Sequence, residues 1–159
     1  MFSAAGELAY LSGWMAFDNA EHALARRYFI LAVKLAARAG NPPLTGHILR
    51  AVAHQAIDLG FFKQGLELAT ASIAGQHHAS ATPRERALLG VVHARGLAAD
   101  GKKQAAAKAL LRAEDDLASA NDDIEEPHRT FFFAEAWLAH ETACTLRDSS
   151  DGPGAIRQW

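Results

Sequence analysis

Apolar residues recur every three or four positions through most of this chain, which is the spacing of one face of an α-helix. Polar segments, glycines and prolines interrupt this spacing and mark the ends of helices. A strong start signal is Thr82 followed by Pro83 and Glu85, because a capping threonine, an early proline and a glutamate favour the first turn. The pattern predicts seven helices, with polar loops at 75–81 and 121–127. Their ranges are 4–18, 21–39, 44–59, 62–75, 83–100, 102–120 and 129–147.

The predicted helices form pairs, and the pairs repeat along the chain. Residues of similar size align between pairs in steps of 40 residues, from 13 to 53, and 41 residues, from 53 to 94. Helix pairs that recur in this way are typical of solenoids, in which each pair packs on the next. The aligned sets are Gly13, Ala53, Ala94; Ala16, Ala56, Leu97; the turn residues Ala20, Gly60, Gly101; Ala25, Gly65, Ala106; Phe29, Ala69, Leu110; and Ala32, Ser72, Ala113.

This pattern resembles the tetratricopeptide repeat, a helical pair of about 34 residues. The first pair fits well, with GWMAF at 13–17 and ARRYFILA at 25–32, and the third pair fits through its aligned small and large residues. The second pair departs from the family pattern, because Gly65 replaces an alanine and Ala69 replaces an aromatic residue. The spacing also exceeds that of the family because the connections between pairs are longer.

The resemblance implies a fold as well as a domain boundary. We expect an all-α chain folded as a right-handed α-α superhelix of about three and a half tetratricopeptide-like hairpins over residues 1–147. Residues 148–159 are expected to form a frayed or flexible tail. The helix at 129–147 would begin a fourth repeat whose second helix is missing. We therefore expect the chain to be a segment, or a truncated relative, of a longer protein.

Composition and charge narrow the class of protein. Alanine fills 35 of the 159 positions, against 10 for valine and isoleucine together, which favours packed helices over sheets. The net charge of −2 argues against direct binding of nucleic acid, which normally needs a basic excess. No apolar run reaches the length of a membrane span, and the N-terminus has no signal-peptide pattern. We expect a cytoplasmic protein, and Cys144, the single cysteine, to be a packing residue.

The chain carries none of the sequence motifs of an enzyme. Glycine-rich phosphate loops, nucleophile elbows and zinc-protease motifs are all missing from it. His47 and His54 lie two turns apart on one predicted helix, about 10 Å, which one zinc ion does not span. His77 and His78 have no acidic or cysteine partner at ligand spacing. We therefore expect no enzymatic activity, no cofactor and no metal site.

The resemblance also points to a ligand-binding surface. In tetratricopeptide proteins the first helices of the pairs line a concave groove that faces a peptide or protein ligand. Arg50 and Arg95 would hold a carboxylate there, because arginine binds carboxylates through two parallel hydrogen bonds. Aromatic side chains would supply apolar anchors. The candidate ligand-binding residues are Tyr10, Trp14, Phe17, His47, Arg50, His54, Arg95, Trp137 and His140, with Asp58, Val91 and Arg147 beside them.

A second interpretation of the same residues stays open. Tyr10, Trp14 and Trp137 could pack against neighbouring helices while Arg50 and Arg95 form ion pairs within the chain. Removing the two arginines and measuring stability and ligand binding separately would distinguish the two interpretations.

Three consecutive phenylalanines at 131–133 suggest a further surface. A helix would spread them around its circumference, so at least one ring would point outward unless something covers it. We expect homodimerisation through this C-terminal helix.

The resemblance extends to a class of proteins. The segments 6–36, 81–101 and 131–148 look like the C-terminal region of bacterial helix-turn-helix transcriptional regulators of the tetratricopeptide class. In these regulators the repeat region senses a ligand or mediates dimerisation, and a separate N-terminal domain binds DNA. The sequence thus suggests a sensor or dimerisation module of a regulator. The alternative is a free-standing scaffold that joins partner proteins without sensing a ligand.

Overall fold

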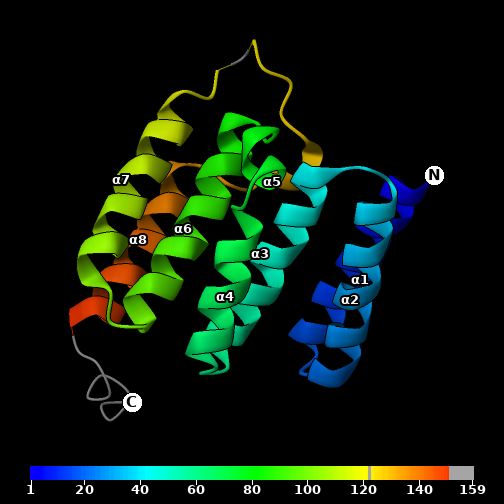
Figure 1. Ribbon diagram of the computed structural model, residues 1–159, viewed down its shortest axis with the longest axis horizontal. Coiled ribbons are helices and arrows are strands. Elements are labelled where there is room, and N and C mark those ends of the chain that lie inside the picture. Colours follow the sequence, from blue (N-terminus) through cyan, green and yellow to red (C-terminus); the bar gives the residue numbers. More distant parts are fainter. Residues whose placement is uncertain (122, 151–159) are drawn as a thin grey trace.

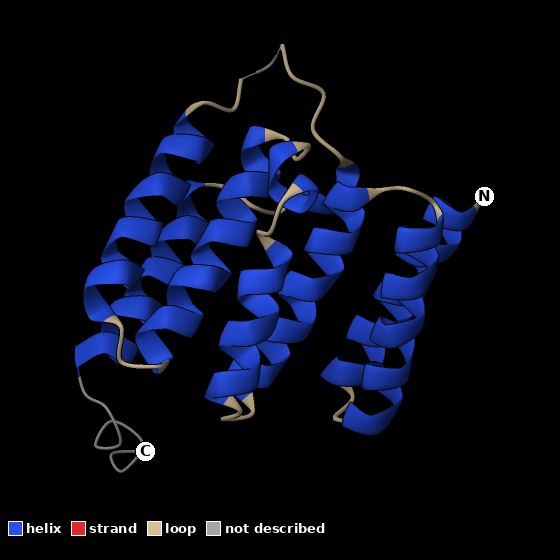
Figure 2. Cartoon of the chain, viewed as in Figure 1, coloured by secondary structure: helices blue, strands red, loops and turns tan. Residues whose placement is uncertain are grey.

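The computed structural model describes residues 1–121 and 123–150, which form eight α-helices and one 3-10 turn. Figure 2 shows helices and loops, with no strand in this part of the chain. The all-α prediction is confirmed. The elements are α1 (Phe2–Asp18), α2 (His22–Arg38), α3 (Pro42–Asp58), α4 (Phe62–Ser72), α5 (Gln76–Ala79), α6 (Pro83–Ala99), α7 (Lys103–Ala118), η1 (His128–Thr130) and α8 (Glu135–Ser150).

The long helices pack as antiparallel hairpins. α1 packs on α2, α3 on α4 and α6 on α7, while α8 packs mainly on α6. Successive hairpins meet because α2 contacts α3 and α4 contacts α6. The helices α1, α3, α6 and α8 also contact one another in that order, and we call them the first-helix layer. Figure 1 shows the hairpins side by side in a row, with α1 and α2 at one end and α7 and α8 at the other.

The hairpins turn where the sequence predicts. Ala20, Gly60 and Gly101 have φ angles of 60°, 83° and 77°. After each of them, the next residue donates a backbone hydrogen bond of 2.8 Å to the carbonyl five positions earlier. This arrangement ends a helix with one left-handed residue, for which glycine is best suited. The turn chemistry of the sequence therefore places three of the hairpin turns directly.

Small residues lie where helices approach each other. A Cβ atom added at Gly13 would lie 2.7 Å from the ring of Phe29, and one added at Gly65 would lie 2.5 Å from the side chain of Ile57. Of the aligned helical positions, all except Leu97 are buried. The repeat alignment thus marks the contacts between helices, and two apolar clusters form there, one over α1–α3 and one over α3–α8.

The structure corrects the sequence prediction in two places. The loop expected at 75–81 contains the short helix α5. The helix expected from residue 129 begins only at Glu135, after the 3-10 turn η1, and continues to Ser150. The expected tail is therefore helical at 148–150, and its remainder, 151–159, lies outside the described residues.

The late start of α8 follows from one buried ring. The side chain of Phe133 is fully buried, whereas Phe131 is 81% exposed. Phe133 donates a backbone hydrogen bond to the Thr130 carbonyl, which turns the chain before the helix. The prediction that one ring points outward is confirmed for Phe131, but not for the reason given, because the three rings precede the helix.

No helix among the described residues has both the length and the apolar character needed to cross a membrane.

Candidate functional site

An ion-pair network centred on Arg95 joins three helices of the first-helix layer. Arg95 on α6 is 8% exposed, and its Nη2 donates a 2.7 Å hydrogen bond to Asp58 Oδ1 on α3. Two carboxylates of α8 lie nearby, Glu141 at 3.9 Å from Nη1 and Asp148 at 3.6 Å from Nε. We call these four residues the Arg95 network. The guanidinium of Arg95 is thus shared among three carboxylates of the same chain.

The charges in this network shift its pKa values. Burial alone would lower the pKa of Arg95, but Asp58, Glu141 and Asp148 outweigh it, and the pKa is raised. Burial would raise the pKa of Asp58, but the hydrogen bond from His54 and the charges of His54 and Arg95 outweigh it, so the pKa is lowered. Both groups are therefore held in their charged forms.

His54 connects the Arg95 network to the aromatic residues of α1. Its Nε2 lies 3.2 Å from Asp58 Oδ2, and its ring centroid lies 6.1 Å from that of Trp14. Trp14 in turn contacts Tyr10 at 6.4 Å and Phe17 at 5.7 Å between ring centroids. A continuous line of contacts thus runs across all four helices of the first-helix layer.

Arg50 on α3 has a different environment. The residue is 5% exposed, its Nη2 donates a 3.1 Å hydrogen bond to the neutral hydroxyl of Tyr10, and its Nε is enclosed without a partner. Within the described part of the chain, no carboxylate forms an ion pair with Arg50. Arg50 is therefore a buried cation without a counter-charge, which is costly in a protein interior.

His47 lies beside this unpaired cation. Its ring is 1% exposed and packs edge-on against Tyr10, with centroids 4.9 Å apart, and both of its ring nitrogens are enclosed without a partner. Burial, followed by the charges of Arg50 and Arg129, holds the pKa of His47 well below its ordinary value. The imidazole is neutral, so the polar groups around Tyr10 carry net positive charge.

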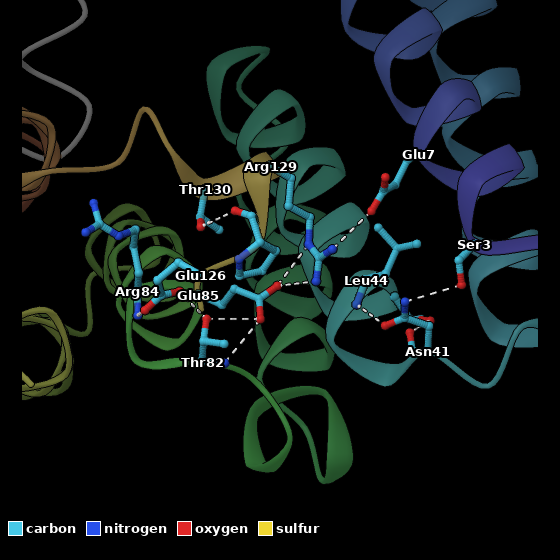
Figure 3. A network of polar contacts seen from close by, with 12 residues as sticks. Ser3, Glu7, Asn41, Leu44, Thr82, Arg84, Glu85, Glu126, Arg129 and Thr130 are labelled. Atoms are coloured by element: carbon cyan, nitrogen blue, oxygen red, sulfur yellow. Dashed lines mark hydrogen bonds and ion pairs between the residues drawn. The ribbon is translucent and has the colours of Figure 1, made fainter. Parts of the chain in front are cut away.

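The segment that precedes α8 closes one end of the first-helix layer. Figure 3 shows Arg129 of η1 between Glu85 on α6 and Glu7 on α1. Arg129 Nε donates to Glu85 Oε1 at 2.9 Å, and Nη1 donates to Glu7 Oε1 at 3.1 Å. Glu126 accepts hydrogen bonds from the Thr82 hydroxyl and from the backbone N–H of Arg84. Arg129, like Arg95, thus has carboxylate partners within the chain.

Trp137 and His140 form a separate group. Trp137 is 44% exposed, and its ring lies 5.7 Å from that of Phe132 and 5.8 Å from that of His140. None of the ring contacts between described residues joins this group to Tyr10 or Trp14. The expected ligand-binding residues therefore divide into a cluster around Tyr10, Trp14 and Arg50, the Arg95 network, and an aromatic group on α8.

These positions change the expectation of an open groove. Tyr10, His47, Arg50 and Arg95 are all buried, and only the remaining candidates are half-buried or exposed. For Arg95 the alternative interpretation, an ion pair within the chain, is the one the structure bears out. The reason is physical, because polar side chains between closely packed helices need partners and find them in each other.

Four acidic residues and one arginine of this region were not predicted as site residues from the sequence: Glu7, Glu85, Glu141, Asp148 and Arg129. Glu141 lies four residues after Trp137, so helical spacing alone could have placed it near the first-helix layer. No local signal marks Arg129, because its partners lie on helices far away in the sequence.

Histidine, cysteine and carboxylate side chains form no close group of three or more in the described residues that could hold a metal ion. The Sγ of Cys144 lies 3.7 Å from Nε2 of His140, which is a contact between two groups only.

No protein-family model, no curated protein and no solved structure matches this chain. The resemblance to tetratricopeptide repeats therefore rests on the aligned residues.

The environment of His47 predicts a pH effect on stability. Its pKa is lower in the folded protein than the value of about 6.5 expected in the unfolded chain. Below pH of about 6.5 the unfolded chain therefore binds a proton that the folded chain does not, and stability falls as the pH decreases. His47→Phe should remove this effect. Relative to the variant, the free energy of unfolding of the wild type should therefore fall by up to about 1.4 kcal/mol for each unit by which the pH is lowered.

Urea unfolding of both proteins between neutral and mildly acidic pH measures this difference. His93 also has a lowered pKa, caused by burial and then by Arg112, but it is present in both proteins and cancels in the comparison. Parallel pH curves for wild type and variant would contradict the assignment.

Proposed function

We propose that this chain is a peptide- or protein-binding module, a right-handed superhelix of about three and a half tetratricopeptide-like hairpins whose ligand lies across the first-helix layer. The stacked hairpins and the small residues at their contacts support the fold. The resemblance described above suggests that the module is the ligand-sensing or dimerisation segment of a bacterial transcriptional regulator, in which another domain binds DNA.

The observation that carries this proposal is the missing counter-charge of Arg50. Arg95 and Arg129 belong to the same region, and both have carboxylate partners within the chain. Arg50 is as deeply buried as Arg95 and has only the Tyr10 hydroxyl. A carboxylate supplied by a ligand would provide the absent charge through strong, charge-assisted hydrogen bonds. The ligand class that follows is a peptide segment with an acidic side chain or a free C-terminus.

The residues near Arg50 suit such a peptide. Trp14 is half-buried and contacts Tyr10, so its ring offers an apolar surface next to the cation. The sequence suggested that Arg50 and Arg95 hold one carboxylate together. We now propose this role for Arg50 alone, because three acidic residues already neutralise Arg95. Arg50 is the residue on which recognition would depend.

The experiment compares two matched pools of fluorescein-labelled octapeptides by fluorescence polarisation. One pool carries aspartate, glutamate and a free C-terminus, and the other carries asparagine, glutamine and a C-terminal amide. Wild type should bind the acidic pool more tightly, and Arg50→Met should weaken that binding at least about tenfold, since a hydrogen bond to a charged group contributes about 1.5–3 kcal/mol.

The exposed Arg27 on α2 offers a matched control, because Arg27→Met removes the same charge away from the first-helix layer. Urea unfolding would establish that both variants are folded. Equal binding of the two pools, or acidic-pool binding that survives Arg50→Met, would reject the carboxylate assignment.

The alternative is a scaffold that joins partner proteins. Exposed apolar side chains at the two ends of the helix row favour it. Leu8, Leu11 and Met15 lie exposed along one side of α1, and Phe131 and Trp137 are exposed near α8. Exposed apolar groups of this kind are typical of protein contacts. Homodimerisation near α8 would cover the second set. A scaffold would bind partners at these ends, and its binding would not depend on Arg50.

A further inference from the structure

A cavity of about 670 Å³ opens between α6, α7 and the region that follows α4. None of the residues that line it belongs to α1, α3 or α8, and its α6 residues, Gly90, His93 and Leu97, are not among those proposed to bind a peptide. Its volume lies in the range of small-molecule sites in proteins.

The sequence explains why this space is open. α4 has 11 residues, whereas α6 has 17, so α4 ends early and leaves part of the neighbouring hairpin uncovered. Where the cavity meets α6 and α7 the side chains are small, with Gly90, Ala105 and Ala109 among the lining residues. Ile73 and Leu97 add larger apolar groups to the wall.

Two cations face this apolar wall. Lys108 and Arg112 lie one turn apart on α7, and both line the cavity. Among the described residues neither forms an ion pair with a carboxylate. Two acidic residues also line the cavity, but Asp116 is already paired with Arg86 at 3.0 Å, which leaves Asp115 as the remaining acidic group.

The pKa of His93 is affected by one of these two cations. His93 is half-buried on α6 and lines the same space, and its pKa is lowered by burial and then by the charge of Arg112. The charge of Arg112 therefore acts on a histidine that lines the same cavity. His78 on α5 also lines the cavity, and its Nε2 lies 3.9 Å from Asp116 Oδ2.

We propose that this cavity binds a small organic anion, with an apolar body against Ile73, Leu97 and Ala109 and an anionic head between Lys108 and Arg112. A purely inorganic anion would leave the apolar wall in contact with water, and a neutral apolar molecule would leave the two cations without a partner. The proposal does not depend on the peptide-binding function, because the two surfaces share no residue.

Octanoate is a suitable probe, with octanol and inorganic phosphate as comparisons. Titration is followed by NMR through the ring protons of His93. Octanoate should shift these signals and raise the pKa of His93, and octanol and phosphate should bind at least about tenfold more weakly. Lys108→Gln combined with Arg112→Gln should weaken octanoate binding at least about tenfold, since the two substitutions remove both charged hydrogen-bond donors proposed to hold the anionic head.

Two further variants make the test specific. Ala109→Leu places a larger side chain in the wall that the apolar body is proposed to contact and should weaken octanoate binding, whereas Lys103→Gln removes a charge from the same helix outside the lining and should leave it unchanged. The proposal is overturned if millimolar octanoate leaves His93 unaffected, if octanol binds equally well, or if octanoate binds folded Ala109→Leu or the folded double variant as tightly as wild type.

Discussion

Arg95→Met should lower the free energy of unfolding by about 3–5 kcal/mol at neutral pH, the cost of removing one partner from a buried ion pair. The substitution would leave Glu141, which is 2% exposed, with no cation in the Arg95 network, and Asp58 would keep only its contact with His54. Because the network joins α3, α6 and α8, its loss should loosen contacts between hairpins. Urea denaturation followed by far-UV circular dichroism measures the effect.

Arg50→Met is the matched comparison. Both arginines lie in the first-helix layer and both are buried, but only Arg95 has carboxylate partners. Replacing an unpaired buried cation by an apolar side chain of similar length should be nearly neutral or stabilising. If the two substitutions lowered the free energy of unfolding equally, the claim that Arg95 is paired and Arg50 is unpaired would be wrong. The argument for a carboxylate supplied by a ligand would then fail as well.

Phe133→Ala should destabilise the protein by about 3–5 kcal/mol, the usual cost of removing a large side chain from a core. The ring is fully buried in the apolar cluster that includes Leu88, Val92 and Leu138. Its backbone carbonyl also accepts a 2.8 Å hydrogen bond from Arg84 Nη1. This residue therefore secures the segment that places Arg129 between α6 and α1. Thermal and urea unfolding would measure the loss.

Phe131→Ala provides the control from the same run of phenylalanines. That ring is 81% exposed and contacts Phe132, so its removal should change the free energy of unfolding by less than about 0.5 kcal/mol. Similar costs for the two alanine substitutions would mean that the ring of Phe133 does not anchor this segment. A cost at Phe131 larger than that at Phe133 would mean that Phe131 is covered in solution, as in the expected homodimer.

The helices were predictable because their signals are local. The predicted range 21–39 corresponds to α2, and the capping sequence at Thr82 and Glu85 starts α6 as expected. Apolar spacing and turn residues act over one or two helical turns, so they do not require knowledge of the remaining structure. The prediction was wrong at the start of α8, where burial of Phe133 overrides local helical preference.

The candidate site was predictable only in part. The resemblance to tetratricopeptide repeats placed Tyr10, Trp14, Arg50 and His54 on helices that share one layer. It did not show which arginine has a partner. Arg95 reaches Asp58 across 37 residues of sequence, and Arg129 reaches Glu7 across 122. Pairings over such distances depend on how the hairpins stack.

By itself the sequence determined the all-α class, the hairpin turns at Ala20, Gly60 and Gly101, and the small residues at helix contacts, because backbone preference and side-chain size act between near neighbours. Only the tertiary structure decided that Arg95 is neutralised, that Arg50 is not, and that a cavity lined by Lys108 and Arg112 stays open. These properties depend on distances between helices, since a charge is compensated, or a space filled, by whichever side chains packing brings within a few ångströms.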